Sequence, residues 1–115
     1  MSTENKVTLQ DIEDAIQIEC YYTAKDGRDG HEVSDTVKII RKEGASLMTE
    51  VVELGLITHC TLILKNGFKV TGDSACVDPA NFDAEIGRKV ARDAAVAKIW
   101  PLLGYELKTK LTEQK

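Results

Sequence analysis

Hydrophobic and polar residues alternate most clearly between residues 57 and 72, and this alternation predicts a β-hairpin. Asn66-Gly67 at its centre is a dipeptide typical of tight hairpin turns. A two-residue loop would mix charged and apolar side chains on both faces, whereas a three-residue loop over 65–67 gives one clean apolar face. We therefore predict the three-residue loop, with Gly67 left-handed. It sets these pairs opposite one another, with Thr61, Lys69 and Thr71 facing outwards: Leu64 and Phe68, Leu62 and Val70, Cys60 and Gly72.

Apolar residues at helical spacing predict a first helix at about residues 9–24. Thr8, followed three residues later by Asp11, is a pattern typical of a capping box at a helix start. The repeating apolar positions are Ile12, Ala15, Ile16 and Cys20. Before this helix we expect a disordered tail over residues 1–7. After it, the composition of residues 25–36 indicates a flexible loop.

The middle of the chain, residues 33–55, carries weaker patterns. Apolar residues between Leu47 and Leu54 are spaced like one side of a helix, and Gly55 suits its C-terminal end. A two-stranded ribbon alone is only marginally stable. A third strand from residues 36–41, or pairing across a homodimer, is therefore expected to complete the sheet.

The longest helical pattern starts at Asp78-Pro79 and runs to about Trp100. Pro101 is expected to end its regular bonding, and the residues beyond it to form a short helix that folds back on the core. The long helix carries an apolar stripe beside a row of small residues that would let another helix or a sheet approach closely. The stripe is Phe82, Ile86, Val90, Ala94 and Ala97, and the small row is Gly87, Ala91 and Ala95.

Together these elements predict an α+β fold in a single domain over residues 1–115. It consists of an N-terminal helix, a β-hairpin with the option of a third strand, and a long C-terminal helix. Aromatic residues make up only 5% of the chain, so the core must be mostly aliphatic and small. Self-association would compensate for such a core, and with the small-residue row it predicts a dimer or higher homo-oligomer.

The composition limits the classes of partner and the compartment. A net charge of −4 argues against an extended nucleic-acid-binding surface. Cys20, Cys60 and Cys76 fit no zinc spacing and are expected as free thiols in a reducing cytosol. The first residues do not resemble a signal peptide, and no apolar stretch approaches the ~20 residues of a membrane span. These features predict a cytoplasmic protein that does not contact a membrane.

Catalytic groups do not assemble in the sequence. His59 and Cys60 are neighbours on a predicted strand, so their side chains point to opposite faces. No arrangement of serine, histidine and aspartate stands out, and no paired cysteine or histidine spacing supports a metal. We therefore expect a non-enzymatic protein with no catalytic residues, no metal ligands and no cofactor.

Four residues are candidates for contact with a partner or ligand. Arg88, Lys89 and Arg92 form a basic row on the long predicted helix, which could bind an acidic group. The alternative is a solvated face held by ordinary ion pairs, with Asp93 four residues after Lys89. Tyr105 is the fourth candidate, because large amphipathic side chains often anchor interfaces.

Residues 27–30, Gly-Arg-Asp-Gly, leave an alternative function open. A G-x-x-G loop after a helix, followed by a possible helix, a hairpin and a last helix, is similar to the order of a KH-type RNA-binding domain. Such loops usually carry basic residues, whereas here Asp26 and Asp29 flank the only arginine. A small nucleic-acid-binding module of KH-like order is thus the second interpretation, although the acidic chain does not favour nucleic acid as a partner.

Three motifs in the second half of the chain resemble a known family. Residues 62–76 read L-x-L-K-N-G-F-x-V-T-G-x-S-A-C, residues 81–92 read N-F-D-A-E-I-G-R-K-V-A-R, and residues 99–105 read I-W-P-L-x-G-Y. They resemble the small tailed-phage and prophage proteins known by their gene-49 and gene-66 members. The resemblance implies an accessory phage protein that acts inside the bacterial host cell, and it indicates an origin rather than a chemistry.

The sequence therefore predicts a non-enzymatic, oligomeric phage accessory protein. It would bind a host protein, or sequester a small ligand at a subunit interface. Either activity would fit a counter-defence role.

Overall fold

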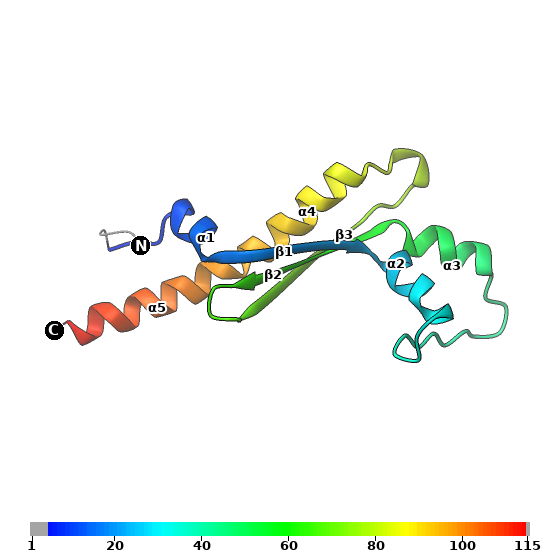
Figure 1. Ribbon diagram of the computed structural model, residues 1–115. Coiled ribbons are helices and arrows are strands. Elements are labelled where there is room, and N and C mark those ends of the chain that lie inside the picture. Colours follow the sequence, from blue (N-terminus) through cyan, green and yellow to red (C-terminus); the bar gives the residue numbers. More distant parts are fainter. Residues whose placement is uncertain (1–4, 115) are drawn as a thin grey trace.

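The computed structural model describes residues 5–114, so most of the tail expected at residues 1–7 lies outside the described residues. A three-stranded antiparallel sheet in the order β1-β2-β3 forms one layer and helix α4 the other (Figure 1). The α+β fold predicted from the sequence is confirmed. In chain order the elements are α1 (Leu9–Ala15), β1 (Ile16–Thr23), α2 (Ala24–Asp29), η1 (Gly30–Glu32), α3 (Leu47–Leu54), β2 (Ile57–Leu64), β3 (Lys69–Ala75), η2 (Pro79–Asn81), α4 (Ala84–Ala97) and α5 (Ile99–Glu113).

The β2–β3 hairpin has the predicted loop and register. The backbone N–H of Leu64 donates to the carbonyl of Phe68 at 2.8 Å, and the N–H of Gly67 donates to the carbonyl of Leu64 at 2.8 Å. Gly67 has a φ of 88°, the left-handed conformation that glycine adopts without strain. Leu62 lies opposite Val70, and Cys60 lies opposite Gly72. The alternation of apolar residues therefore predicted the loop and the register of this hairpin correctly.

The predicted first helix is wrong beyond Ala15. The capping box at Thr8 is present, but the helix ends after two turns and residues 16–23 form strand β1. This strand pairs antiparallel with β2, with Tyr21 opposite Cys60, so β2 is hydrogen-bonded on both sides. The third strand thus exists, but it comes from residues 16–23 and not from residues 36–41, which contain no strand.

A small helical lobe extends from one end of the sheet (Figure 1). The stretch 25–36, expected to be a loop, instead begins with α2 and η1, because Thr23 and Asp26 form a capping box. Helix α3 and its end at Gly55 match the prediction. Glu50 on α3 accepts hydrogen bonds from Arg28 at 2.7 Å and from Arg41 at 2.6 Å. These two bonds hold α2 and the segment after it against α3.

The row of small residues on α4 packs against the sheet of its own chain. Ala91 and Ala95 have no exposed surface. A Cβ atom on Gly72 would lie 2.3 Å from the Ala91 carbonyl oxygen and 2.4 Å from the Ala95 nitrogen. The close approach predicted for this row therefore occurs within the molecule. The apolar stripe beside it stays largely open, since Ile86 and Val90 are exposed.

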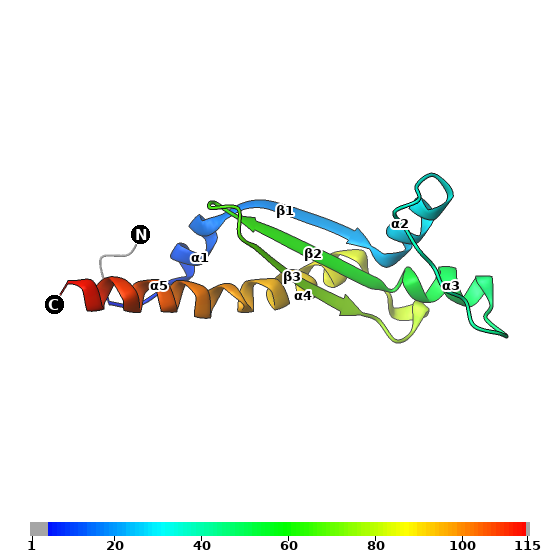
Figure 2. The same ribbon diagram turned by 90° about the horizontal axis from the view of Figure 1, so that it is seen from below.

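The long C-terminal helix differs from its prediction at both ends. Asp78 and Pro79 begin only the short η2 helix, and Asp83 caps the start of α4. Pro101 does not end the helical region, because it lies in the first turn of α5, where a missing N–H costs no hydrogen bond. Helix α5 continues in nearly the direction of α4 instead of folding back (Figures 1 and 2).

The hydrophobic core lies between α4 and the covered face of the sheet. Side chains from α1 and from the start of α5 close it at one end. Its buried members are Ile12, Cys60, Leu62, Leu64, Val70, Ala91, Ala95 and Ile99. Most are aliphatic or small, as the low aromatic content predicted.

Replacing Glu50 with glutamine is expected to loosen the helical lobe in a pH-dependent way. The hydrogen bonds from Arg41 and then Arg28 lower the pKa of Glu50 from 4.5 to about 2. A lowered folded-state pKa means that the stabilisation is complete above 4.5 and is lost as the pH falls toward 2. The Tm difference between wild type and Glu50→Gln should therefore be constant above about pH 5 and shrink below it. Glu53→Gln, on the exposed side of the same helix, is the control and should show no such trend.

Candidate functional site

Arg92, one of the predicted binding residues, is held in an ion-pair network. Its Nη2 lies 2.7 Å from Glu13 on α1, and its Nε lies 3.0 Å from Glu19 on β1. The Tyr21 hydroxyl donates to the same Glu19 carboxylate at 2.6 Å. Arg92 and then Tyr21 lower the pKa of Glu19, while burial and the Glu19 charge raise the pKa of Tyr21. The ion pairs of Arg92 therefore connect α4 to α1 and to β1.

The other two members of the basic row differ from each other. Lys89 pairs with Asp93 at 2.9 Å, the surface ion pair expected from their spacing. Arg88 is exposed and makes no ion pair among the described residues. It borders an open cleft of about 210 Å³ at the end of β1, together with Tyr22 and Phe82. Of the row, Arg88 is thus the member whose charge is available to a ligand.

Tyr105 lies apart from the basic row. It is 79% exposed on α5, thirteen residues after Arg92. At 1.5 Å per residue the two positions are about 20 Å apart along the helix axis. The structure therefore does not bring the four predicted residues into one site, and their role in binding remains a prediction.

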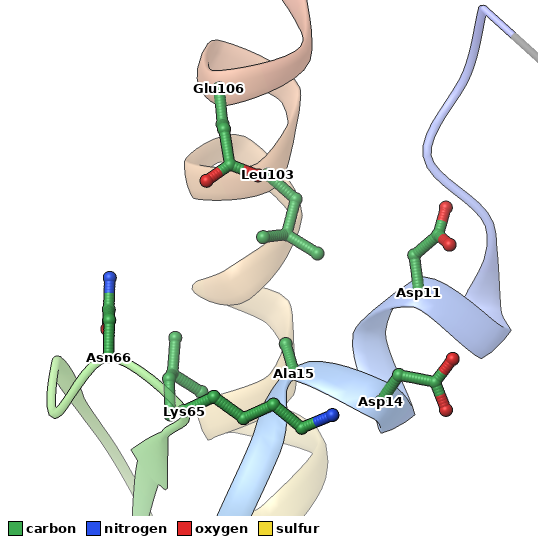
Figure 3. A pocket seen from close by; sticks show the side chains of 8 residues that line it. Asp11, Asp14, Ala15, Lys65, Asn66, Leu103 and Glu106 are labelled. Carbon is green, nitrogen blue, oxygen red and sulfur yellow. The ribbon is translucent and has the colours of Figure 1, made fainter. Parts of the chain in front are cut away.

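A second cleft, not expected from the sequence, lies between α1, the β2–β3 loop and α5 (Figure 3). Its volume is about 300 Å³. Leu103 points from α5 toward Ala15, while Asp11 and Asp14 lie on α1 at the opposite side (Figure 3). The lining residues are Asp11, Asp14, Ala15, Leu64, Lys65, Asn66, Leu103 and Glu106.

The polar groups around this cleft are already oriented by neighbours. Asp14 accepts a 2.7 Å hydrogen bond from Gln10, and Asp11 accepts one of 3.0 Å from the Thr8 N–H. The Lys65 N–H donates to the Ala15 carbonyl at 3.0 Å, which joins the hairpin loop to the junction of α1 and β1. An apolar floor with a mainly acidic rim suits a small ligand that has an apolar body and a positive charge. Only the spacing of Asp11 and Asp14 on one helix side could have indicated the site from sequence.

The Gly27–Gly30 segment does not form an open phosphate-binding loop. Gly27 lies in α2 and Gly30 begins η1. Arg28 donates hydrogen bonds to Glu50 at 2.7 Å and to Asp29 at 3.1 Å. Its guanidinium is therefore already paired with two carboxylates and is not free to bind a phosphate. From β1 onward the elements are a strand, helices α2 and α3, the β2–β3 hairpin and helix α4, so the element order of the KH comparison is present. The ion-paired arginine of the segment is what argues against that comparison.

Cys60 and His59 do not form a nucleophile–base pair, because they lie on opposite faces of the sheet. Cys60 is buried on the α4 side of the sheet, and burial raises the pKa of its thiol. His59 lies on the opposite face, as predicted, with its ring centroid 5.3 Å from that of Tyr22. All three cysteines are free thiols. Within residues 5–114, no three histidine, cysteine, aspartate or glutamate side chains gather closely enough to hold a metal ion.

The fold and its surfaces define a small two-layer α+β protein, with one sheet face and several clefts open to solvent. The family model described as the phage protein (N4 Gp49/phage Sf6 gene 66) family matches residues 7–111, so the chain belongs to this family of phage proteins. The resemblance found in the second half of the sequence is confirmed, and the match also includes the helical lobe. No curated protein matches the chain, and no solved structure matches it. None of the helices in the described range is long and apolar enough to cross a membrane.

Proposed function

We propose that this phage protein is a non-enzymatic accessory protein that works as a homo-oligomer in the host cytoplasm. In this role it binds a host protein or sequesters a small ligand. A protein that acts by occupying a target needs exposed binding surface and no assembled catalytic groups. Such an activity would serve the phage against a host defence that depends on the captured molecule.

The observation that carries the proposal is the unusually large surface of the chain. The accessible surface is 8222 Å², whereas a monomeric protein of 12.7 kDa exposes about 6,200 Å². The radius of gyration is 18.5 Å, against about 13 Å for a compact domain of this length. The molecule is also elongated, with extents of 63 × 32 × 22 Å. Surface of this extent is typical of a chain that completes its burial against other molecules.

The chemistry of the described residues favours binding over turnover. Cys60 is a poor nucleophile, because a buried thiol with a raised pKa forms little thiolate. Lys89 and Arg92 are engaged in ion pairs, which leaves Arg88 and Tyr105 as the exposed members of the predicted set that form no ion pair among the described residues. We place the small ligand in the cleft beside Leu103 and a protein partner on the exposed surface of α4 and α5, which carries Arg88 and Tyr105 at two separate positions.

Native mass spectrometry of protein purified from bacterial lysate without denaturation tests this function. The expected spectrum shows a homo-oligomer that carries extra small mass. The variant Leu103→Arg fills the cleft with a charged side chain and should lose that mass, while Tyr105→Ala, on the same helix but exposed, should retain it. If Leu103→Arg keeps the same bound mass, the cleft is not the ligand site. A bare monomer would contradict the proposal as a whole.

A further inference from the structure

One face of the sheet has no helix over it. Helix α4 covers the side that holds Cys60 and Leu62, and Figure 2 looks onto the other side with α4 behind the strands. The pairing register decides which side chains face outwards there. They are Ile18, Cys20 and Tyr22 on β1, Ile57, His59, Thr61 and Ile63 on β2, and Lys69, Thr71, Asp73 and Ala75 on β3.

This open face is apolar on β1 and half apolar on β2, which is unusual for a solvated sheet. An antiparallel sheet with one face in water normally places polar residues on that face. Here all three outward residues of β1 are apolar or aromatic, and Ile18 and Tyr22 are 51% and 43% exposed. Strand β2 adds Ile57 and Ile63, which alternate with His59 and Thr61. Charged residues appear only on β3, so the face has an apolar half and a charged rim.

We propose that a second copy of this chain packs face to face on the open sheet face, about a two-fold axis that runs across the strands. This inference rests on the homo-oligomer of the proposed function and adds the interface and its geometry. The axis passes over the row in which Cys20, Thr61 and Thr71 lie side by side in the register. Each of these three residues then faces the same residue of the second copy.

The distribution of side chains selects this orientation of the axis. An axis parallel to the strands would exchange the two edges of the sheet, so the apolar β1 would lie over the charged β3 of the partner. An axis across the strands stacks β1 on β1 and β2 on β2, apolar half on apolar half. Ile18 then lies opposite the partner's Tyr22, because both are two residues from Cys20.

Charge complementarity on β3 supports the same geometry. Lys69 and Asp73 lie two residues on either side of Thr71. The two-fold axis therefore places Lys69 opposite the partner's Asp73, and the pair occurs twice. Among the described residues the Lys69 ammonium donates to the Gly67 carbonyl at 3.2 Å and forms no ion pair, and Asp73 forms none either. Both charges are thus available to the second copy.

The surface of the chain is large enough for such an interface. It exceeds that of a typical monomer of this mass by about 2,000 Å². A stable interface of standard size buries about 800 Å² on each partner. Another exposed apolar strip, Ile86 and Val90 on α4 beside the end of β3, lies on a different side of the molecule and provides the comparison.

Sedimentation velocity of purified full-length variants tests the interface. Ile18→Asp places a charge in the apolar half and should weaken dimerisation at least a hundredfold, so that monomer dominates at micromolar concentration. Ile86→Asp is the matched control, with the same change at a residue that is 61% exposed, and should remain dimeric. Circular dichroism confirms that both variants are folded. If Ile86→Asp dissociates and Ile18→Asp does not, the interface is the α4 strip and the inference is wrong.

A charge swap tests the orientation of the two-fold axis without placing a charge in the apolar half of the open face. Lys69→Asp alone creates two like-charge contacts in the dimer and should weaken it roughly tenfold, and Asp73→Lys should do the same. The double variant Lys69→Asp, Asp73→Lys restores both pairs and should recover most of the wild-type affinity. No recovery would overturn the two-fold geometry. A wild-type oligomer insensitive to all these changes defeats this inference alone, whereas a wild-type monomer also defeats the proposed oligomer.

Discussion

Replacing Gly72 with alanine is expected to lower the free energy of unfolding by about 3 kcal/mol, at the upper end of overpacking costs. A Cβ atom there would lie 2.3 Å from the Ala91 carbonyl oxygen and 2.9 Å from the Ala94 carbonyl carbon. These are backbone atoms, so no side-chain rotation can relieve the contact. Helix α4 must move away from β3, which would open the core around Ala91 and Ala95. Urea unfolding followed by circular dichroism measures the change.

Gly104→Ala is the matched control for this prediction. Gly104 lies inside α5, and a Cβ atom on it would have no neighbour within 4 Å. Alanine is a better helix former than glycine, so the substitution should stabilise the protein by about 0.5–1 kcal/mol. Equal destabilisation by the two variants would contradict the close packing of α4 on the sheet.

Replacing Ile99 with alanine is expected to destabilise the protein by about 3 kcal/mol, within the range for large-to-small changes in a core. Ile99 has no exposed surface and packs in the core at the point where α5 begins. Its loss leaves a cavity at the only core residue on α5 that is fully buried among those described. Helix α5 should therefore detach more readily, which hydrogen exchange over residues 99–113 would detect.

Tyr105→Ala on the same helix separates stability from binding. Tyr105 is 79% exposed, so its removal should change the free energy of unfolding by no more than about 0.5 kcal/mol. If Tyr105 contacts a partner, the variant should bind that partner more weakly while folding as well as the wild type. A large loss of stability would show that Tyr105 has a structural role instead.

The hairpin could be predicted from sequence because two independent signals agree there. Asn66-Gly67 fixes the turn, and the apolar alternation on both sides leaves one register with a clean apolar face. Helix α3 was predicted for a similar reason, since its apolar spacing ends at Gly55. Local chemistry was sufficient where the pattern and the terminating residue indicated the same element.

The secondary-structure predictions were wrong where a local sequence pattern fits two different structures. Ile12, Ala15, Ile16 and Cys20 have helical spacing, but Ile16, Ile18, Cys20 and Tyr22 also alternate, and pairing with β2 decides in favour of the strand. A proline interrupts a helix only when it lies in the helix interior. The break at Lys98 begins a new helix, α5, and places Pro101 in its first turn. For β1 the deciding contact is distant in sequence, so no local pattern could identify the strand.

The candidate sites were less predictable than the fold. The cleft beside Leu103 depends on the direction of α5 and on the early end of α1, both of which the sequence prediction missed. Arg92 forms ion pairs with Glu19, which is 73 residues earlier in the chain, and with Glu13, which is 79 residues earlier. The open sheet face depends on β1 being a strand, so it too was hidden until the register was known.

Sedimentation equilibrium of the wild-type chain over a range of concentrations tests whether the protein forms a homo-oligomer. The weight-average mass is expected to rise from the 12.7 kDa of one chain to twice that value or more. Ile18→Asp is expected to abolish this rise. A mass of 12.7 kDa at every concentration up to about 100 μM, where even weak homo-oligomers associate, would contradict the proposed homo-oligomer.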